Sequence, residues 1–312
     1  MFDVVIVGGG PAGLSAALIL GRSRRNVLLC DDRKPRNEAS RELHGYLTRD
    51  GVSPAQLLQL GREELRRYGV EQRHARVVDV RRHVDGFDVG LAGGERVLAR
   101  LLLLATGVRD RIPDVPGLME CYGRSAHHCP YCDGWEVRDT RVVVLGDERS
   151  PAGLALSLKT WTQTVVACRT GRTRISNTHR KLLAAKQIAL CDSPIAVIHH
   201  TNGQVRAVGL TSGEQVECDA LFFAAPQEQQ CELPRQLGCE FTRKGTVKTD
   251  HLGTTCVPGV YVVGDASRDV QFVIVAAAEG AKAGVAINAI LQQRDGLTIV
   301  RTPEPAEMRT NV

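Results

Sequence analysis

Two cysteines separated by two residues are the groups in this chain best suited to redox chemistry. Residues 127–134 read His-His-Cys-Pro-Tyr-Cys-Asp-Gly, and Cys129 and Cys132 form the one CxxC pair in the sequence. Two thiols at this spacing can close a small disulfide, and a neighbouring acid can supply or remove the proton that thiol exchange requires. Asp133 follows the pair directly. The run therefore predicts a redox-active disulfide with Asp133 as its acid.

Two histidines precede the pair and admit more than one interpretation. Either could act as a general base or lower the pKa of a thiol, and we take His128 as the catalytic candidate. A structural histidine is the competing interpretation for both His127 and His128. A zinc site built from the cysteines and histidines is disfavoured, because the spacing leaves few residues to bend a tetrahedral shell. We predict no metal.

A glycine-rich turn suited to a dinucleotide pyrophosphate lies at the start of the chain. Residues 3–7 predict a strand, residues 14–24 a helix and residues 26–30 a second strand, with Gly-Gly-Gly-Pro-Ala-Gly between the first two. The three glycines at 8, 10 and 13 allow a tight turn, approach of the backbone to phosphate, and close helix–strand packing. An acidic residue at the end of the second strand can bind ribose hydroxyls. The candidate binding residues are Gly8, Gly10, Pro11, Ala12, Gly13, Asp31 and Asp32.

The remaining elements must bring this turn and the cysteines together. Periodicity predicts an amphipathic helix over 54–68 and a buried strand over 101–104 that ends in Ala105, Thr106 and Gly107. A second strand–helix–strand unit follows a linker at 112–117 and repeats the plan of the first. Further expected elements are strands at 70–80, 86–90, 141–145, 164–168, 196–200, 205–210, 216–224 and 260–263, and helices at 151–161 and 272–293.

Composition narrows the class of protein. The chain has 312 residues, 43% hydrophobic and 24% charged, with a net charge of +5, which is ordinary for an α/β protein. The charge is spread along the chain and aromatics make up 4%, so we expect no nucleic-acid binding. No apolar run approaches the roughly 20 residues of a membrane span. We expect a cytoplasmic protein without membrane contact, whose other cysteines are mostly reduced.

Four separated pieces together resemble the low-molecular-weight thioredoxin reductase family of FAD enzymes. They are Gly8 to Gly13, Ala105 to Gly107, the CxxC pair, and Gly264-Asp265 before the last helix. The resemblance implies that Asp265 binds the ribityl chain of FAD and that Gln271 and Phe272 set a helix N-terminus near the flavin, where it stabilises negative charge. It also implies that Cys132 is nearer the flavin, that Cys129 exchanges with the partner, and that the protein is a homodimer.

The resemblance implies a fold and its domains. The fold is α/β, with two Rossmann-like dinucleotide-binding domains. Residues 1–114 and 244–295 would form a discontinuous FAD-binding domain, and residues 115–243 an inserted NAD(P)-type domain that carries the disulfide. Residues 296–312 would form a tail. The run 44–51 is similar to a branch that includes atypical bacterial reductase-like proteins and fungal dithiol oxidases, so His44 or Tyr46 is expected against the flavin or as a packed loop residue.

The second glycine-rich turn departs from the family pattern. After the strand at 142–145 the sequence is Gly146-Asp147-Glu148-Arg149-Ser150-Pro151, and Glu148 stands where the second glycine belongs. A side chain there obstructs the pyrophosphate, and its carboxylate repels it by about 4 kcal/mol per unit charge at 4 Å. The ribose-phosphate motif is reduced to Arg169 and Arg174. NADPH use is therefore doubtful.

Three functions remain open from the sequence. The first is a thioredoxin-type disulfide reductase, supplied by NADPH or by a ferredoxin, although residues 297–312 lack an aromatic ring to stack on the flavin. The second is a dithiol oxidase that passes electrons from a small or protein dithiol to oxygen. The third is a flavin redox sensor with little turnover. The expected partner is a thioredoxin-like protein or a small disulfide or dithiol.

Overall fold

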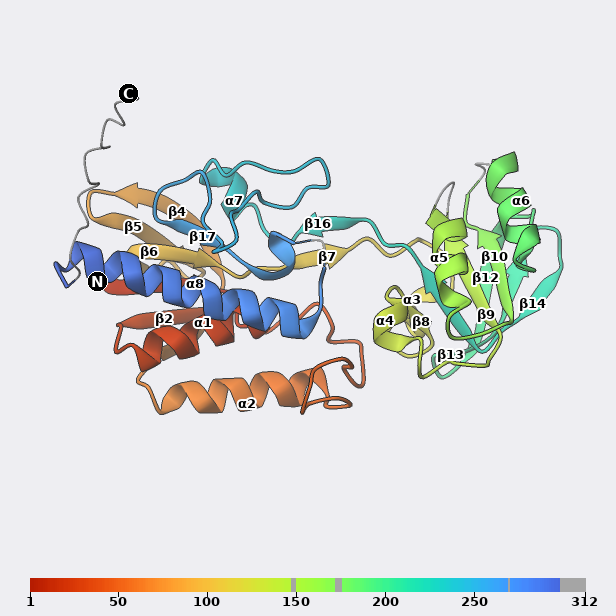
Figure 1. The fold of residues 1–312 in the computed structure, drawn as a ribbon, viewed down its shortest axis with the longest axis horizontal. Helices are drawn as coiled ribbons and strands as arrows, with labels where there is room; N and C mark the ends of the chain where they lie inside the picture. Colours follow the sequence, from red (N-terminus) through yellow and green to blue (C-terminus); the bar gives the residue numbers. More distant parts are fainter. Residues whose placement is uncertain (147–149, 172–175, 269, 298–312) are drawn as a thin grey trace, which may run out of the picture.

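Two lobes, each built on its own mainly parallel sheet, make up the computed structural model (Figure 1). The structure describes residues 1–146, 150–171, 176–268 and 270–297. Both ends of this range lie in the first lobe, since the chain leaves for the second lobe and returns.

The first lobe contains a seven-stranded sheet in the order β3-β2-β1-β6-β5-β4, with β17 also beside β6. β1, β2, β3 and β6 run parallel, and β4 and β5 form an antiparallel extension. The buried parts of β1 (residues 4–7) and β6 (residues 101–104) are wholly apolar because both of their faces are covered. The strands are β1 (Phe2–Val7), β2 (Val27–Asp31), β3 (Glu71–His74), β4 (Val77–His83), β5 (Gly86–Leu91), β6 (Arg96–Leu104) and β17 (Val260–Val262).

Three long helices pack beside this sheet. They are α1 (Pro11–Arg22), α2 (Pro54–Arg66) and α8 (Val273–Arg294). The apolar face of α8 packs along α1 through small residues such as Ala283 and Gly284, so the two helices lie close together. The opposite face of the sheet packs against the short helix α7 (Leu233–Gln236) and the segment before β17. The 3-10 turn η1 (Gly264–Ala266) follows β17.

One expectation from the sequence is wrong for α8. This helix has 22 residues and is long and apolar enough to cross a membrane by length and composition alone, whereas no such run was expected. Glu279 and Lys282 interrupt the apolar run, but the helix is apolar on average. The helix packs on α1, and core helices of globular proteins pass the same test of length and composition.

The second lobe contains a five-stranded parallel sheet in the order β11-β10-β9-β15-β8. A three-stranded antiparallel sheet, β12-β13-β14, packs against it. The strands are β8 (Ala126–His127), β9 (Val142–Gly146), β10 (Val165–Arg169), β11 (Ala189–Cys191), β12 (Ile195–Thr201), β13 (Gln204–Leu210), β14 (Gln215–Glu217) and β15 (Ala220–Phe223), and the helices are α3 (Leu118–Cys121), α4 (Pro130–Asp133), α5 (Ser150–Leu158) and α6 (Asn177–Ala185).

Two short antiparallel strands lie where the chain passes between the lobes. β7 (Val108–Asp110) pairs with β16 (Gln227–Gln229), one on the outgoing connection and one on the return (Figure 1). The exposed pair Arg109 and Glu228 face each other on this ribbon. Residues at this crossing can therefore contact both lobes.

The sequence predicted one strand over 216–224 where the structure has two. β14 pairs antiparallel with β13, and β15 then enters the five-stranded sheet in parallel with β9. The break falls at Cys218 and Asp219, where the Asp219 carboxylate accepts a hydrogen bond from the backbone N–H of Arg141 and holds the corner. A continuous apolar pattern does not reveal such a change of sheet.

Candidate functional site

A cavity of about 240 Å³, open to solvent, runs from the glycine turn of the first lobe to the cysteine pair of the second. It is lined at one end by Gly8, Gly9 and Gly10, where β1 meets α1. At the other end it is lined by Cys129 and Cys132. One site therefore contains both sets of residues that the sequence singled out.

The glycines at positions 8, 10 and 13 of the turn lie in different steric surroundings. Gly8 has φ +105°, and a Cβ there would lie 2.3 Å from the carbonyl oxygen of Ala105. A Cβ at Gly13 would lie 1.9 Å from the carbonyl oxygen of Gly8, so only glycine allows α1 to approach β1 this closely. A Cβ at Gly10 would meet nothing within 4 Å, because this position faces the open cavity.

The residues present fit a dinucleotide such as FAD. The N-cap of α1 is Gly10, which offers no side-chain cap, so the first N–H groups of the helix are left for an anionic ligand. Asp31 ends β2, Asp32 follows it, and both line the same cavity, where their carboxylates could accept hydrogen bonds from ribose hydroxyls. Within the described residues the buried Oε1 of Gln230, also in the lining, accepts no hydrogen bond. This oxygen is an acceptor that a bound ligand could satisfy.

The cysteines form a disulfide at the N-terminus of α4. Cys129 is the N-cap of this helix, and its Sγ accepts a hydrogen bond from the backbone N–H of Cys132. Their Cα atoms lie 5.3 Å apart, within the range of a disulfide. Both residues are half-buried, whereas Tyr131 between them is 72% exposed and contacts Trp161 and Phe272 edge-on. The pair thus faces the cavity beside a surface that a partner can reach.

Asp133 is held by a histidine. Nδ1 of His127 lies 3.0 Å from Oδ1 of Asp133, and the side chain of His127 is 10% exposed. His127 comes from β8 and Asp133 from α4, so the pair joins the sheet of the second lobe to the disulfide helix. A carboxylate and an imidazole at this distance can share a proton next to Cys132.

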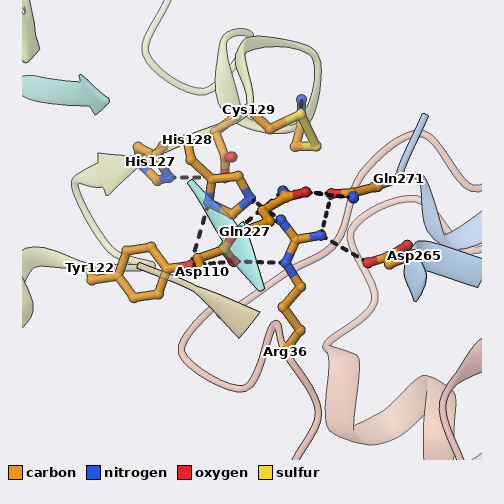
Figure 2. The surroundings of a disulfide bond; sticks show 11 residues. Arg36, Asp110, Tyr122, His127, His128, Cys129, Gln227, Asp265 and Gln271 are labelled. Carbon is orange, nitrogen blue, oxygen red and sulfur yellow. Dashed lines mark hydrogen bonds and ion pairs between the residues drawn. A yellow bond between two sulfur atoms is a disulfide. The ribbon is translucent and has the colours of Figure 1, made fainter. Parts of the chain in front are cut away.

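Arg36 is the centre of a polar cluster below the disulfide (Figure 2). Its Nε and Nη2 donate to the two carboxylate oxygens of Asp110, both at 2.7 Å. Its Nη1 donates to Asp265 at 2.8 Å and to Gln271 at 2.6 Å. Its Nη2 also lies 3.4 Å from Nε2 of His128. From the loop after β2, the guanidinium therefore reaches Asp110 of β7, Asp265 and Gln271 in the cavity lining, and His128 beside the cysteine pair.

These charges shift the pKa values of the cluster in different directions. The Arg36 guanidinium holds the pKa of Asp110 below its usual range in spite of burial, which acts the other way. Burial lowers the pKa of His128, and Arg36 lowers it further, while Asp110 acts to raise it. Burial and the charge of Asp110 raise the pKa of Tyr122 to about 12. At neutral pH the cluster therefore contains a charged ion pair, a neutral histidine and a protonated tyrosine.

His44 lies at the rim of the cavity among three carboxylates. Its ring nitrogens are 3.5 Å from Glu136, 3.6 Å from Asp50 and 3.7 Å from Glu42. Of the two candidates in this run, His44 lines the cavity and Tyr46 is not part of its lining. The structure thus places His44, rather than Tyr46, in the cavity wall, where a bound ligand would contact it.

Almost all candidate residues lie in this one cavity. Gly13 and Tyr46 are exceptions: Gly13 lies beneath the turn, and Tyr46 is not part of the lining. Sequence reasoning missed Arg36, Asp110 and Tyr122, which lie in loops or at element ends where periodicity carries no signal. The lining candidates are Gly8, Gly10, Pro11, Ala12, Asp31, Asp32, His44, Ala105, Thr106, Gly107, His128, Cys129, Cys132, Asp133, Gly264, Asp265, Gln271 and Phe272.

Two parts of the sequence argument lie outside the described residues. Residues 147–149, which include Glu148, and residues 172–175, which include Arg174, belong to the altered nucleotide motifs. Most of the expected tail, 298–312, is also outside. Among the described residues no group of three or more His, Cys, Asp or Glu side chains is arranged to hold a metal ion.

Comparison with known proteins gives consistent relatives. The family model for pyridine nucleotide-disulphide oxidoreductases matches residues 2–280. A probable thioredoxin reductase of Arthroderma benhamiae is 31% identical over 86% of this chain and 74% of its own. The crystal structure of HlmI is 36% identical with a TM-score of 0.91, covering 95% of this chain and 94% of that one. A putative thioredoxin reductase TrxB from Bacillus anthracis is 31% identical with a TM-score of 0.90, covering 95% and 100%.

Proposed function

The chain belongs to the pyridine nucleotide-disulphide oxidoreductase family, and we propose that it exchanges electrons between FAD in the described cavity and the Cys129–Cys132 disulfide. The family and the two-Rossmann fold predicted from the sequence are confirmed. The protein is a flavin-dependent disulfide oxidoreductase of the thioredoxin reductase type. The observation that supports the proposal most is the cavity itself, which joins the glycine turn to the disulfide.

The residues of the cavity have distinct proposed roles. The turn at Gly8 to Gly13 binds the pyrophosphate through backbone N–H groups, and Asp31 binds the adenosine ribose. Bound FAD supplies or accepts the electron pair that breaks or forms the disulfide. Asp265 and Gln271, which Arg36 holds together, line the part of the cavity next to the disulfide. Two groups transfer protons to and from the cysteine thiols. One is Asp133, which is paired with His127, and the other is His128.

Exchange with a partner moves one electron pair between the partner and the Cys129–Cys132 disulfide. A partner thiolate attacks Sγ of Cys129, the Cys129–Cys132 bond breaks, and Cys132 leaves as a thiolate. The second partner thiol gives its proton to the neutral His128 and, as a thiolate, displaces Cys129 from the mixed disulfide; the protons lost by the two partner thiols balance those taken up by the two cysteine thiolates. The partner is now oxidised by one electron pair and the enzyme holds two thiols. The same steps in reverse reduce a partner disulfide.

We propose that the electron pair does not come from NADPH. The support is the sequence of the second turn, where Glu148 replaces the glycine that lets a pyrophosphate approach. A thioredoxin-like protein or a small dithiol is the proposed partner, and the similarity to proteins named thioredoxin reductase supports that class.

An anaerobic bleaching experiment tests the proposal. The FAD-loaded chain is mixed with NADPH, a reduced ferredoxin or a dithiol, and flavin absorbance is followed. We expect rapid bleaching by a dithiol, little by NADPH, and loss of the dithiol reaction in Cys129→Ser. The matched control is Cys256→Ser, which removes an exposed free cysteine outside the cavity lining. Rapid bleaching by micromolar NADPH would overturn the donor assignment, and an unchanged reaction in Cys129→Ser would overturn the proposed site.

A further inference from the structure

His128 belongs to a closed ring of four polar side chains below the disulfide (Figure 2). Arg36 contacts Nε2 of His128, Tyr122 Oη lies 3.4 Å from Nδ1 of the same ring, and Tyr122 donates to Asp110 at 3.4 Å. Asp110 closes the ring by accepting two hydrogen bonds from Arg36. Tyr122 and His128 are also stacked, with their ring centroids 6.1 Å apart.

The donors and acceptors of this ring fit a single arrangement of protons. A guanidinium has only donors, so Nε2 of His128 must accept from Arg36 and carry no proton. Nδ1 then carries the proton and donates to Tyr122 Oη. Tyr122 remains protonated and donates to the Asp110 carboxylate. The arrangement makes His128 a neutral imidazole of defined tautomer, which is the form that a proton acceptor requires.

We propose that Arg36 is a positioning residue of the redox site, which fixes the tautomer of His128 through its contact with Nε2 and holds the segment before Cys129 against the flavin cavity. Arg36 is suited to this because its fork binds Asp110 while Nη1 binds Asp265 and Gln271 of the cavity. A lysine has one charged nitrogen and cannot make these contacts together. The inference rests on disulfide exchange at Cys129 and Cys132 and extends it to a residue that does not touch the sulfur atoms.

The charges facing His128 fix the direction of the expected effects. Arg36 from the loop after β2 and His127 from β8 act to lower the pKa of His128, as does burial. Asp110 from β7 and Asp133 from α4 act to raise it, and Tyr122 is neutral. In Arg36→Met the opposing cation is gone and Asp110 remains, so the pKa of His128 rises. In Asp110→Asn the anion is gone and the pKa of His128 falls.

Histidine NMR of the full chain tests the inference without relying on activity. Ring-labelled protein is titrated with acid, and the His128 signal is identified by its loss in His128→Gln. We expect the pKa of His128 to rise by about one unit, a tenfold change, in Arg36→Met. It should fall in Asp110→Asn and stay unchanged in Arg109→Met, which removes an exposed arginine from the same crossing ribbon. An unchanged pKa in both Arg36→Met and Asp110→Asn would overturn the inference.

A pH profile then links the ring to the reaction. In Arg36→Met the acid limb of dithiol-driven flavin bleaching should move to higher pH by the same shift, with the rate recovered at alkaline pH. Arg36→Lys keeps the positive charge, so the acid limb of this variant should lie closer to that of the wild type than the acid limb of Arg36→Met does. A rate lowered equally at every pH would show a merely structural role and contradict the inference. If no dithiol bleaches the wild-type flavin, the proposed function fails, and the NMR titration still decides the role of Arg36.

Discussion

Gly280 of α8 offers a stringent test of how this fold is packed. A Cβ at this position would lie 1.9 Å from the carbonyl oxygen of Ala12, whereas real Cβ contacts are essentially never under 3.0 Å. Ala12 belongs to α1, so in Gly280→Ala helices α1 and α8 must separate by about 1 Å, because a backbone oxygen cannot rotate away as a side chain can. A gap of this size removes a quarter to a half of the dispersion energy of the contacts across it. Those contacts include the fully buried Ala283 and Ile287.

The magnitude follows from two opposing effects. Overpacking costs about 1–3 kcal/mol, and the rigid contact favours the upper end. Alanine returns roughly 1 kcal/mol of helix propensity, so we expect a net loss of about 2 kcal/mol. Because Ala12 belongs to the glycine turn, FAD should also be held more weakly.

Urea unfolding of the full chain without FAD, followed by circular dichroism, measures the loss. The control is Gly153→Ala in α5, where a Cβ would meet nothing within 4 Å. The same substitution should stabilise there by about 0.5–1 kcal/mol. The reasoning is refuted if Gly280→Ala is as stable as the wild type.

Three further predictions concern the cavity and its ion pair. Gly10→Ala should change the free energy of unfolding by no more than about 0.5 kcal/mol, because the backbone φ of −73° at this position suits alanine. The same variant should bind FAD at least about tenfold more weakly in equilibrium dialysis, because the added methyl group faces the cavity. Normal FAD affinity would argue against a phosphate site at Gly10. Asp110→Asn should destabilise the chain by about 3 kcal/mol at pH 7 in urea unfolding, since it removes one partner of a buried pair. The folded pKa of Asp110 is lowered, so its contribution is complete above the unfolded pKa of about 3.9 and is lost as pH falls through the folded value; a gap to the wild type that widened at low pH would contradict this sign. Cys132→Ser should abolish disulfide exchange with a dithiol in a thiol-release assay, while Cys256→Ser retains it; retained exchange in Cys132→Ser would exclude the pair.

The glycine turn and the disulfide could be predicted because each is a local pattern with a local cause. Gly8 and Gly13 are required by contacts within one strand–turn–helix unit. Cys129 and Cys132 close a loop of four residues whose geometry does not depend on the rest of the chain. Buried parallel strands such as β1 and β6 are also visible as apolar runs. These features gave the fold class and most of the cavity.

The closed ring of four polar side chains that includes His128 could not be predicted from the sequence, because its members are far apart along the chain. Arg36 and Asp110 are separated by 74 residues, and Arg36 and His128 by 92. An arginine in a loop is ordinarily solvated, and only the crossing of the two connecting strands brings these side chains together. The division of one predicted strand into β14 and β15 has the same origin, since the choice of sheet depends on distant partners. The domain boundaries, the homodimer and the cytoplasmic location remain predictions.

The central claim is that the disulfide and the bound flavin form one redox unit, and counting electrons tests it most directly. The FAD-loaded chain is reduced anaerobically by titration with dithionite. The wild type should take up one electron pair for the flavin and a second for the Cys129–Cys132 disulfide, and the double variant Cys129→Ser/Cys132→Ser only the first. Uptake of a single pair by both proteins would contradict the account.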